Sequence, residues 1–285
     1  MKKHAYLIMA HNEFNILKKL ILLLDDARND IYVHVDKKSE DFDLVQYSGL
    51  AKKSTLIFVE RTAVTWGAYS QINAELVLLR NAITNRYEYY HLLSGSDLPI
   101  KMQDEVHLFF EQHLGCEFLD FDKRAFATKN FHDRFQYYHF FQERMGKNRK
   151  GIYNFMNKVF LKLQQIFGIN RTMKSKYVFN KGLNWFSITH NLANYVLSQE
   201  KYIKKTFKYS LSGDEVFIHT LVWNSSFKNQ ICDQRLRYTK KGRPYIFRAD
   251  DFDSLQKSNA FWARKFSEET DSFIVDKIFR YLQIQ

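Results

Sequence analysis

The first 122 residues alternate between short apolar runs and longer segments with helical spacing. Runs typical of strands are expected at residues 5–10, 30–36, 56–59, 87–93 and 116–121. Helices are expected at 11–24, 70–84 and 103–113, with Asn12 as the cap of the first. Strands that alternate with helices in this way form right-handed βαβ units. The sequence therefore predicts an α/β fold, with a Rossmann-like, mostly parallel sheet and flanking helices.

Composition predicts a single domain in three parts. The chain has 285 residues, 45% of them hydrophobic, so it can bury a sizeable core. Ten Gly and two Pro leave no room for a linker or a low-complexity region. We divide the chain into an N-terminal half, about residues 1–122, and a C-terminal half, 177–285. Between them, 123–176 form a basic, aromatic insertion, with a helix expected over 154–167 and no visible match to a known motif.

The formal net charge is +12, which suits an anionic partner. Nucleic acid, an anionic membrane and a phosphorylated substrate all fit such an excess. The sequence has no zinc-finger spacing and no aromatic signature of an RNA-recognition motif, so no nucleic-acid partner is expected. Basic residues crowd 147–150, 201–208 and 235–248. Each run alone is typical of a solvated face, while together they would hold the protein against anionic lipid.

The two cysteines, Cys116 and Cys232, lie far apart in the sequence and have no metal-ligand spacing. This suits a reducing compartment and argues against a disulfide scaffold. The apolar run at 5–10 is too short for a signal peptide or a membrane span. We therefore expect a cytoplasmic protein, with peripheral attachment to the inner face of the cell membrane as an option.

A polar turn, Ser94-Gly-Ser-Asp97, directly follows the strand expected at 87–93, and Pro99 closes it. In an open α/β sheet, ligands bind beyond the carboxyl ends of the strands. The turn offers two hydroxyls and one carboxylate at that position. Ser94, Ser96 and Asp97 are therefore candidate ligand-binding residues.

Other candidates also follow strands or precede helices. His34 and Asp36 alternate with valines, so both point to one face at the end of their strand. His11 follows the first strand in the same way. Trp66 stands before the 70–84 helix, whose free N–H groups suit an anion, although a core position is about equally compatible.

The second half offers an aromatic and two acidic candidates. Trp185, in a strand expected from residue 182, could stack on a sugar ring or pack in the core. Asp214 and Glu215 stand at the start of a helix expected over 214–223. The helix dipole stabilises an anion at this position. Asp214 is expected to cap the helix and contact the acceptor, which leaves Glu215 free for chemistry.

Together these segments resemble the Core-2/I-branching glycosyltransferases, glycosyltransferase family 14. This family includes β-1,6-N-acetylglucosaminyltransferases and protein O-xylosyltransferases. The resemblance runs from about residue 5 to 270 and rests on motifs at 33–38, 65–70, 90–101, 181–187, 210–215 and 261–266. The last motif departs from the family pattern at Trp262 and Ser267. The resemblance implies a GT-A-like fold and a UDP-sugar donor. It makes residues 1–122 the nucleotide-binding half and 177–285 the acceptor and catalytic half of one glycosyltransferase domain.

The resemblance also implies residue roles. Glu215 takes the place of the family's general base, and Lys265 the place of a lysine thought to grip the nucleotide diphosphate. An arginine upstream shares this role with the lysine. Arg243 matches that arginine by distance only, and Arg248 could fill the same position. Arg264 is a further nucleotide contact, or else one half of a solvated charge pair. His11, His34, Asp36, Trp66 and the residues of the 94–97 turn complete the expected nucleotide-sugar site.

A metal site is the alternative for handling the diphosphate, because many glycosyltransferases of this architecture use an Asp-x-Asp motif. Residues 120–122 and 251–253 both match it, but so short a pattern arises by chance. The resembled family is metal-independent, so no metal cofactor is expected.

The predicted function is an inverting transfer of a sugar, with N-acetylglucosamine as first choice. The donor is a UDP-sugar, and the acceptor is a hydroxyl of a glycan or a lipid-linked oligosaccharide. The alternatives are a transferase of UDP-xylose or another UDP-hexose, and a nucleotide- or glycan-binding module without catalysis.

Overall fold

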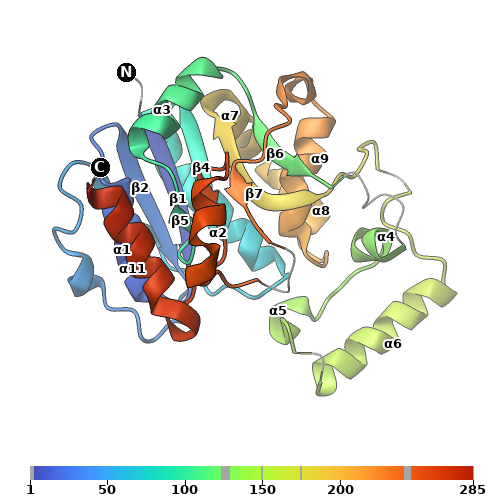
Figure 1. The fold of residues 1–285 in the computed structure, drawn as a ribbon. Coiled ribbons are helices and arrows are strands. Elements are labelled where there is room, and N and C mark those ends of the chain that lie inside the picture. Colours follow the sequence, from blue (N-terminus) through green and yellow to red (C-terminus); the bar gives the residue numbers. More distant parts are fainter. Residues whose placement is uncertain (1–2, 123–128, 149, 174, 241–244, 285) are drawn as a thin grey trace.

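The computed structural model describes residues 3–122, 129–148, 150–173, 175–240 and 245–284 (Figure 1). Its strands are β1 (His4–Ala10), β2 (Asn29–Val35), β3 (Thr55–Phe58), β4 (Tyr89–Ser94), β5 (Leu98–Pro99), β6 (Phe118–Phe121), β7 (Gly182–Thr189), β8 (Arg237–Tyr238) and β9 (Trp262–Ala263). Its α-helices are α1 (Phe14–Leu24), α2 (Tyr69–Ala82), α3 (Gln103–Gln112), α4 (Lys129–Gln136), α5 (Gln142–Met145), α6 (Ile152–Ile166), α7 (His190–Ser198), α8 (Glu200–Phe207), α9 (Phe217–Trp223), α10 (Phe252–Gln256) and α11 (Glu268–Ile284).

The main sheet of the described chain has the strand order β3-β2-β1-β4-β7-β6. Strands β1 to β4 run parallel to one another, and β7 runs antiparallel to both β4 and β6. The expected α/β fold with a mostly parallel sheet is therefore confirmed. The last strand predicted in the first half, now β6, pairs with β7 at the antiparallel end of the sheet. Strands from both halves of the chain thus share one sheet.

Helices cover both faces of this sheet (Figure 1). In β1, Tyr6 and Ile8 face a core built with α1, α3 and α11, while Ala5 and Leu7 face a core built with α2, α7 and α9. Side chains of a strand alternate between faces, and here both sets are apolar because both faces are covered. This burial explains why the predicted strands are almost continuously apolar.

The strand order creates one place suited to ligands. The chain crosses from β1 to β2 and β3 on one side, and then returns to β4 on the other side. The carboxyl ends of β1 and β4 therefore diverge at a topological switch point. Gly95 closes this point: its backbone N–H donates to the Met9 carbonyl at 2.8 Å, and a Cβ there would meet the Cβ of Ala10 at 2.8 Å.

A small second sheet, in the order β5-β9-β8, carries the C-terminal segment to the same edge. Leu98, just after the 94–97 turn, pairs with Ala263. The Phe266 N–H then donates to the Ser96 carbonyl at 3.0 Å. As a result, residues 262–266 lie beside the end of β4, although the two segments are far apart in the sequence.

Two predicted helix starts were wrong. Helix α1 is preceded by Glu13, in a left-handed conformation, rather than capped by Asn12. The helix expected over 214–223 is split into a 3₁₀ turn, Gly213–Glu215, and α9, whose first flanking residue is Val216. Asp214 is therefore no helix cap, and Glu215 does not occupy the first turn of an α-helix.

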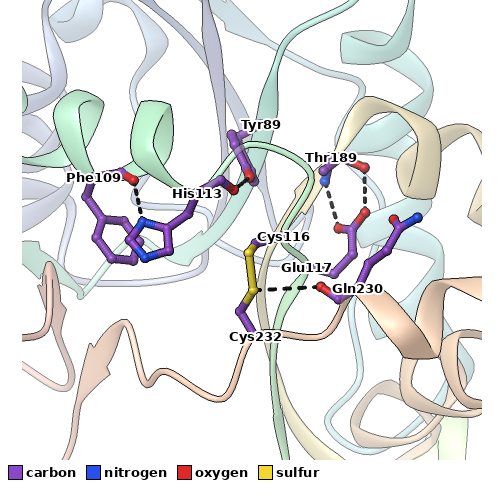
Figure 2. Close-up of a disulfide and its surroundings, with 8 residues drawn as sticks. All are labelled: Tyr89, Phe109, His113, Cys116, Glu117, Thr189, Gln230 and Cys232. Carbon is purple, nitrogen blue, oxygen red and sulfur yellow. Dashed lines mark hydrogen bonds between the residues drawn. A yellow bond between two sulfur atoms is a disulfide. The ribbon is translucent and has the colours of Figure 1, made fainter.

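The cysteine prediction was also wrong, because Cys116 and Cys232 form a disulfide (Figure 2). Backbone hydrogen bonds join the two segments on either side of it: the Glu117 N–H donates to the Gln230 carbonyl at 2.8 Å, and the Cys232 N–H to the Glu117 carbonyl at 3.0 Å. The large separation of the two cysteines along the sequence did not indicate that the fold brings them together. The argument for a reducing compartment from unpaired cysteines therefore loses its basis.

We predict that Cys232→Ser lowers the free energy of unfolding by about 2–5 kcal/mol, because the bridge closes a long loop in the unfolded chain. Denaturant unfolding of the wild type and the variant measures the difference, and a reducing agent should destabilise only the wild type. Two thiols that react with a thiol-reactive dye in the native, unreduced wild type would contradict the disulfide.

Candidate functional site

The first group of candidate residues lies beyond the ends of β1 and β2. His11 directly follows β1, and Asp36 directly follows β2. Asp36 is buried; its backbone N–H donates to the Ala10 carbonyl at 2.9 Å, and its Oδ1 accepts from the N–H groups of Lys38 and Val64, both at 3.0 Å. Asp36 therefore fixes the loops around the strand ends, and its bond to Ala10 places it beside the start of the loop that contains His11.

Ser94, Ser96 and Asp97 of the 94–97 turn are buried, and hydrogen bonds between them stabilise the turn. The hydroxyls of Ser94 and Ser96 lie 3.2 Å apart, and the Ser94 N–H donates to Asp97 Oδ2 at 3.0 Å. Asp97 is 0% exposed. Its carboxylate pairs with Arg264 Nη1 at 2.9 Å and Arg237 Nε at 3.4 Å. These paired arginines satisfy a buried charge that would otherwise be costly.

Trp185, on β7, lies against the same arginines. The guanidinium carbon of Arg264 is 4.3 Å from the Trp185 ring centroid, and that of Arg237 is 4.8 Å away. Both are within the range of cation–π attraction. The indole therefore contributes to holding Arg264, and stacking of a sugar on Trp185 stays a prediction. A shallow hollow beside Trp185 is lined by Leu183, Asp120 and Arg237.

Basic side chains from several segments lie near one another at the strand ends. They are Lys265, Arg264, Lys147 and His11, and we name them the cation cluster. Desolvation, and then the neighbouring cations Arg264 and Lys147, lower the pKa of Lys265, while Glu13 and Asp97 oppose the shift. Desolvation followed by Lys265 and Arg264 likewise lowers the pKa of His11, although this side chain still reaches solvent and Asp36 opposes the shift. Nearby cations lower a basic group's pKa when too little negative charge offsets them. The cluster thus favours an anionic ligand.

The other expected nucleotide contacts lie at different distances from this cluster. Trp66 is 44% exposed, and the Lys147 ammonium lies 5.8 Å from its ring centroid, so Trp66 borders the cluster. His34 is buried, and its Nε2 lies 2.9 Å from the Thr62 hydroxyl. Arg248 is exposed, and it directly follows Phe247, whose backbone N–H donates to the Lys265 carbonyl at 3.0 Å. Arg243 lies outside the described residues.

Glu215 stands at the same edge of the sheet. Lys181, just before the antiparallel strand β7, places its ammonium 3.0 Å from Glu215 Oε2, and Arg134 Nη1 lies 3.1 Å from the same oxygen. The Ser212 N–H donates to the Gly67 carbonyl at 2.8 Å, which joins the Glu215 loop to the Trp66 turn. The Glu215 side chain is 34% exposed. Its carboxylate is thus oriented by two cations and open to solvent.

Behind Glu215 lies a pair of buried carboxyl groups. Burial and the charge of Glu215 raise the pKa of Asp214 to about 7, and Gln71 donates to its Oδ2 at 3.1 Å. Glu75, on α2, is fully buried, and neither of its oxygens has a hydrogen-bond partner among the described residues. Burial and Asp214 raise the Glu75 pKa well above its usual value. Burial without a hydrogen-bond partner thus favours the neutral carboxylic acid form of Glu75.

The two Asp-x-Asp patterns are engaged in ion pairs. Asp120 Oδ2 lies 3.0 Å from Arg235 Nε, and Asp251 pairs with Lys240 and accepts from the Tyr245 hydroxyl. Within the part of the chain that the structure describes, no three His, Cys, Asp or Glu side chains are grouped as metal ligands.

Comparison with known proteins decides the family. The sequence profile described as "Branch: Core-2/I-Branching enzyme" matches residues 4–244. This span is most of the chain. The chain belongs to the Core-2/I-branching enzyme family. The resemblance noted from the sequence motifs is thereby confirmed.

Relatives of this Core-2/I-branching protein are glycosyltransferases. Rat xylosyltransferase 2 is 22% identical over 95% of this chain and 33% of its own length. The Arabidopsis thaliana β-glucuronosyltransferase GlcAT14B is 23% identical over 96% and 64%. The human β-1,3-galactosyl-O-glycosyl-glycoprotein β-1,6-N-acetylglucosaminyltransferase is 23% identical over 98% and 69%. The chain thus spans about a third of the length of the xylosyltransferases that it matches.

Among solved structures, apo mouse xyloside xylosyltransferase 1 matches with a TM-score of 0.39, 11% identity and coverage of 92% of this chain and 97% of that one. Residues 1–349 of Staphylococcus aureus TarS with UDP match with a TM-score of 0.44, 12% identity and coverage of 99% and 66%. Both scores are below 0.5, so these likenesses add nothing to the family match.

Several residues at the site were not predicted as such. Arg237 is the deepest cation: burial lowers its pKa to about 10 and Asp97 opposes the shift. In the sequence it is one member of a basic run, with no mark of burial. Arg134 and Lys147 lie in the insertion, which has no motif to align. Glu75 lies within an apolar stretch of the helix predicted over 70–84. A glutamate among apolar residues was the one sequence signal that could have indicated a buried acid.

We predict that Glu75→Gln flattens the dependence of stability on pH. A carboxyl group whose folded pKa is raised stabilises the fold most below its unfolded pKa, about 4.3 for Glu, and this contribution is lost as pH rises. The difference in Tm between the wild type and the variant should therefore shift against the wild type as pH rises from 5 to 8. Exposed Glu111→Gln is the matched control. Equal slopes for Glu75→Gln and the wild type would contradict the buried acid.

Proposed function

We propose that this protein is an inverting glycosyltransferase that moves a sugar, with N-acetylglucosamine as first choice, from a UDP-sugar to a hydroxyl of a glycan. The product is a β-linkage, and Glu215 is the general base. The observation that carries the proposal is the cluster of Lys265, Arg264, Lys147 and His11 at the topological switch point of a Core-2/I-branching chain. That is where an open α/β sheet binds ligands.

The cation cluster supports a nucleotide diphosphate as the leaving group. Lys265 and Arg264 are half-buried, and desolvation followed by neighbouring cations lowers the pKa of Lys265, so an anion of two or more charges would relieve the repulsion. Fixed cations at such a position also stabilise the charge that develops on the departing diphosphate. In this proposal Lys265 and Arg264 hold the diphosphate, and no metal is required. Arg264 suits this role because Asp97 and Trp185 already hold its guanidinium.

The position of Glu215 supports its role as base. Arg134 and Lys181 orient its carboxylate through Oε2, and a third of the side chain reaches solvent, where an acceptor hydroxyl can approach. An inverting transfer needs one carboxylate to take the proton of the attacking hydroxyl, and it needs no nucleophile on the opposite face of the sugar. The neighbour Asp214 is buried and paired with Gln71, so it is the poorer candidate.

Two alternatives remain open to experiment. The names of the relatives include transferases of xylose, glucuronic acid and N-acetylglucosamine, so another UDP-sugar is the first alternative. The second is a binding module without catalysis, which would bind UDP but turn over no donor.

We predict that Glu215→Gln binds UDP as the wild type does and turns over donor at least about a hundredfold more slowly, because the amide cannot accept a proton. UDP release with a panel of UDP-sugars and glycan acceptors measures turnover, and calorimetry measures UDP affinity. Glu200→Gln is the matched control, since Glu200 also pairs with an arginine, Arg80, but on the helical face remote from the strand ends.

Near-normal turnover by Glu215→Gln would remove Glu215 from the role of base. An α-linked product from an α-linked donor would contradict the inverting transfer. UDP binding by the wild type without turnover of any donor would favour the binding module.

A further inference from the structure

Helix α6 exposes its apolar face. Ile152 and Phe155 are each 63% exposed and Ile166 is 68% exposed, and Val159 and Leu163 between them are exposed as well. The spacing 152, 155, 159, 163, 166 places these five side chains along one side of an α-helix. We name them the α6 stripe. A surface helix of a globular protein normally turns such a stripe toward the core.

The opposite side of α6 is polar and buried. Asn154, Asn157 and Gln164 are the buried residues of the helix. Gln164 accepts from the Tyr138 N–H at 2.7 Å and donates to the Tyr138 carbonyl at 3.0 Å. Hydrogen bonds therefore fix the helix to the segment before it. None of the stripe residues belongs to either apolar core of the described chain. Figure 1 shows α6 at the periphery of the molecule, away from the sheet.

The chain segment that contains the stripe carries charge of a single sign. Residues 144–181 contain ten Lys or Arg and no Asp or Glu. Lys158 and Lys162 are exposed on α6 and lie beside the stripe on the helix surface. The apolar surface continues past the helix to Phe167 and Met173, which are also exposed. An apolar strip flanked by cations matches a surface that is apolar inside and anionic outside.

We propose that the α6 stripe docks this protein on an anionic lipid bilayer. The apolar side chains enter the boundary between headgroups and acyl chains, and Lys158 and Lys162 contact anionic headgroups. No helix of the described residues has the length and apolar character needed to cross a bilayer. The docking is therefore peripheral, with α6 parallel to the membrane plane.

A second copy of the chain fits the stripe less well. A two-fold interface places the same patch on both subunits, so the basic segment 144–181 would face itself. Like charges at close range repel, and this segment has no acidic residue to offset them. Anionic lipid offers the opposite charge.

Docking would also orient the candidate site. Lys147 precedes α6 by a few residues and lies over Trp66 at the edge of the cation cluster. If the proposed function holds, an acceptor attached to the membrane would thus be presented near the site. The docking itself rests only on α6 and its charges.

The test is co-sedimentation of the full chain with vesicles of phosphatidylcholine alone or of an equimolar mixture of phosphatidylcholine and phosphatidylglycerol. We expect the wild type to bind the anionic vesicles, and to bind less as salt rises. Ile152→Ser/Phe155→Ser/Ile166→Ser should bind at least about tenfold more weakly. Leu44→Ser/Val45→Ser, which removes exposed apolar side chains elsewhere, is the matched control and should bind like the wild type.

A second variant, Lys158→Gln/Lys162→Gln, should lose part of the preference for anionic vesicles while it keeps its fold. The proposal is overturned if the wild type binds neither kind of vesicle or if the triple variant binds as the wild type does. If the wild type is a dimer and the triple variant is a monomer, the stripe is instead an interface between two copies of the chain. UDP affinity measured on the same preparations separates failure of the docking from failure of the proposed function.

Discussion

The buried carboxylate of Asp97 holds the candidate site together. Asp97 is the last residue of the turn after β4, and it is fully buried. Its carboxylate forms ion pairs with Arg264 and Arg237 of the C-terminal segment. Removing one partner of such a pair leaves an uncompensated buried charge, which typically costs about 3–5 kcal/mol. Because Arg264 is adjacent to Lys265, the same contact determines where the lysine stands. A C-terminal segment thus supplies the basic side chains at the switch point of the sheet.

This arrangement has an electrostatic consequence. Asp97 is shared by two arginines, so it offsets only part of the positive charge at the strand ends. Lys265 and Lys147 add to the excess, and the pKa values of Lys265 and His11 fall in response to desolvation and these cations. The basic side chains repel one another, and an anion that binds between them removes this repulsion. The side chains are already in position, so binding needs no reorganisation. The ion pairs with Asp97 and the contacts with Trp185 thereby fix the arginines of this cationic site.

Some of this was predictable from the sequence. The apolar runs that became β1, β2 and β4 are covered on both faces, so their composition alone marked them as strands. The 94–97 turn and the C-terminal motif were recognised from local residue patterns, and both lie at the site. Asp214 shows the limit of such patterns: a residue typical of a helix cap is instead buried beside Glu75, because α2 packs over its turn.

Other features depend on contacts between distant segments, which no local pattern reports. Cys116 and Cys232 meet because backbone pairing at Glu117 joins two segments 116 positions apart. Arg237 looks like its basic neighbours in the sequence, and only the position of Asp97 selects it for burial. In α6 the periodicity was correctly assigned to a helix, but the usual assumption that the apolar side faces inward fails, because Gln164 fixes the polar side.

The central claim is that the cation cluster at the strand ends binds a nucleotide diphosphate without a metal ion. Isothermal titration of UDP into the protein in the presence of EDTA tests it most directly. The account predicts binding by the wild type, weakening of at least about tenfold in Lys265→Ala, and no change in exposed Lys257→Ala. Binding that appears only when a divalent cation is supplied, or that is equal in Lys265→Ala and the wild type, would contradict it.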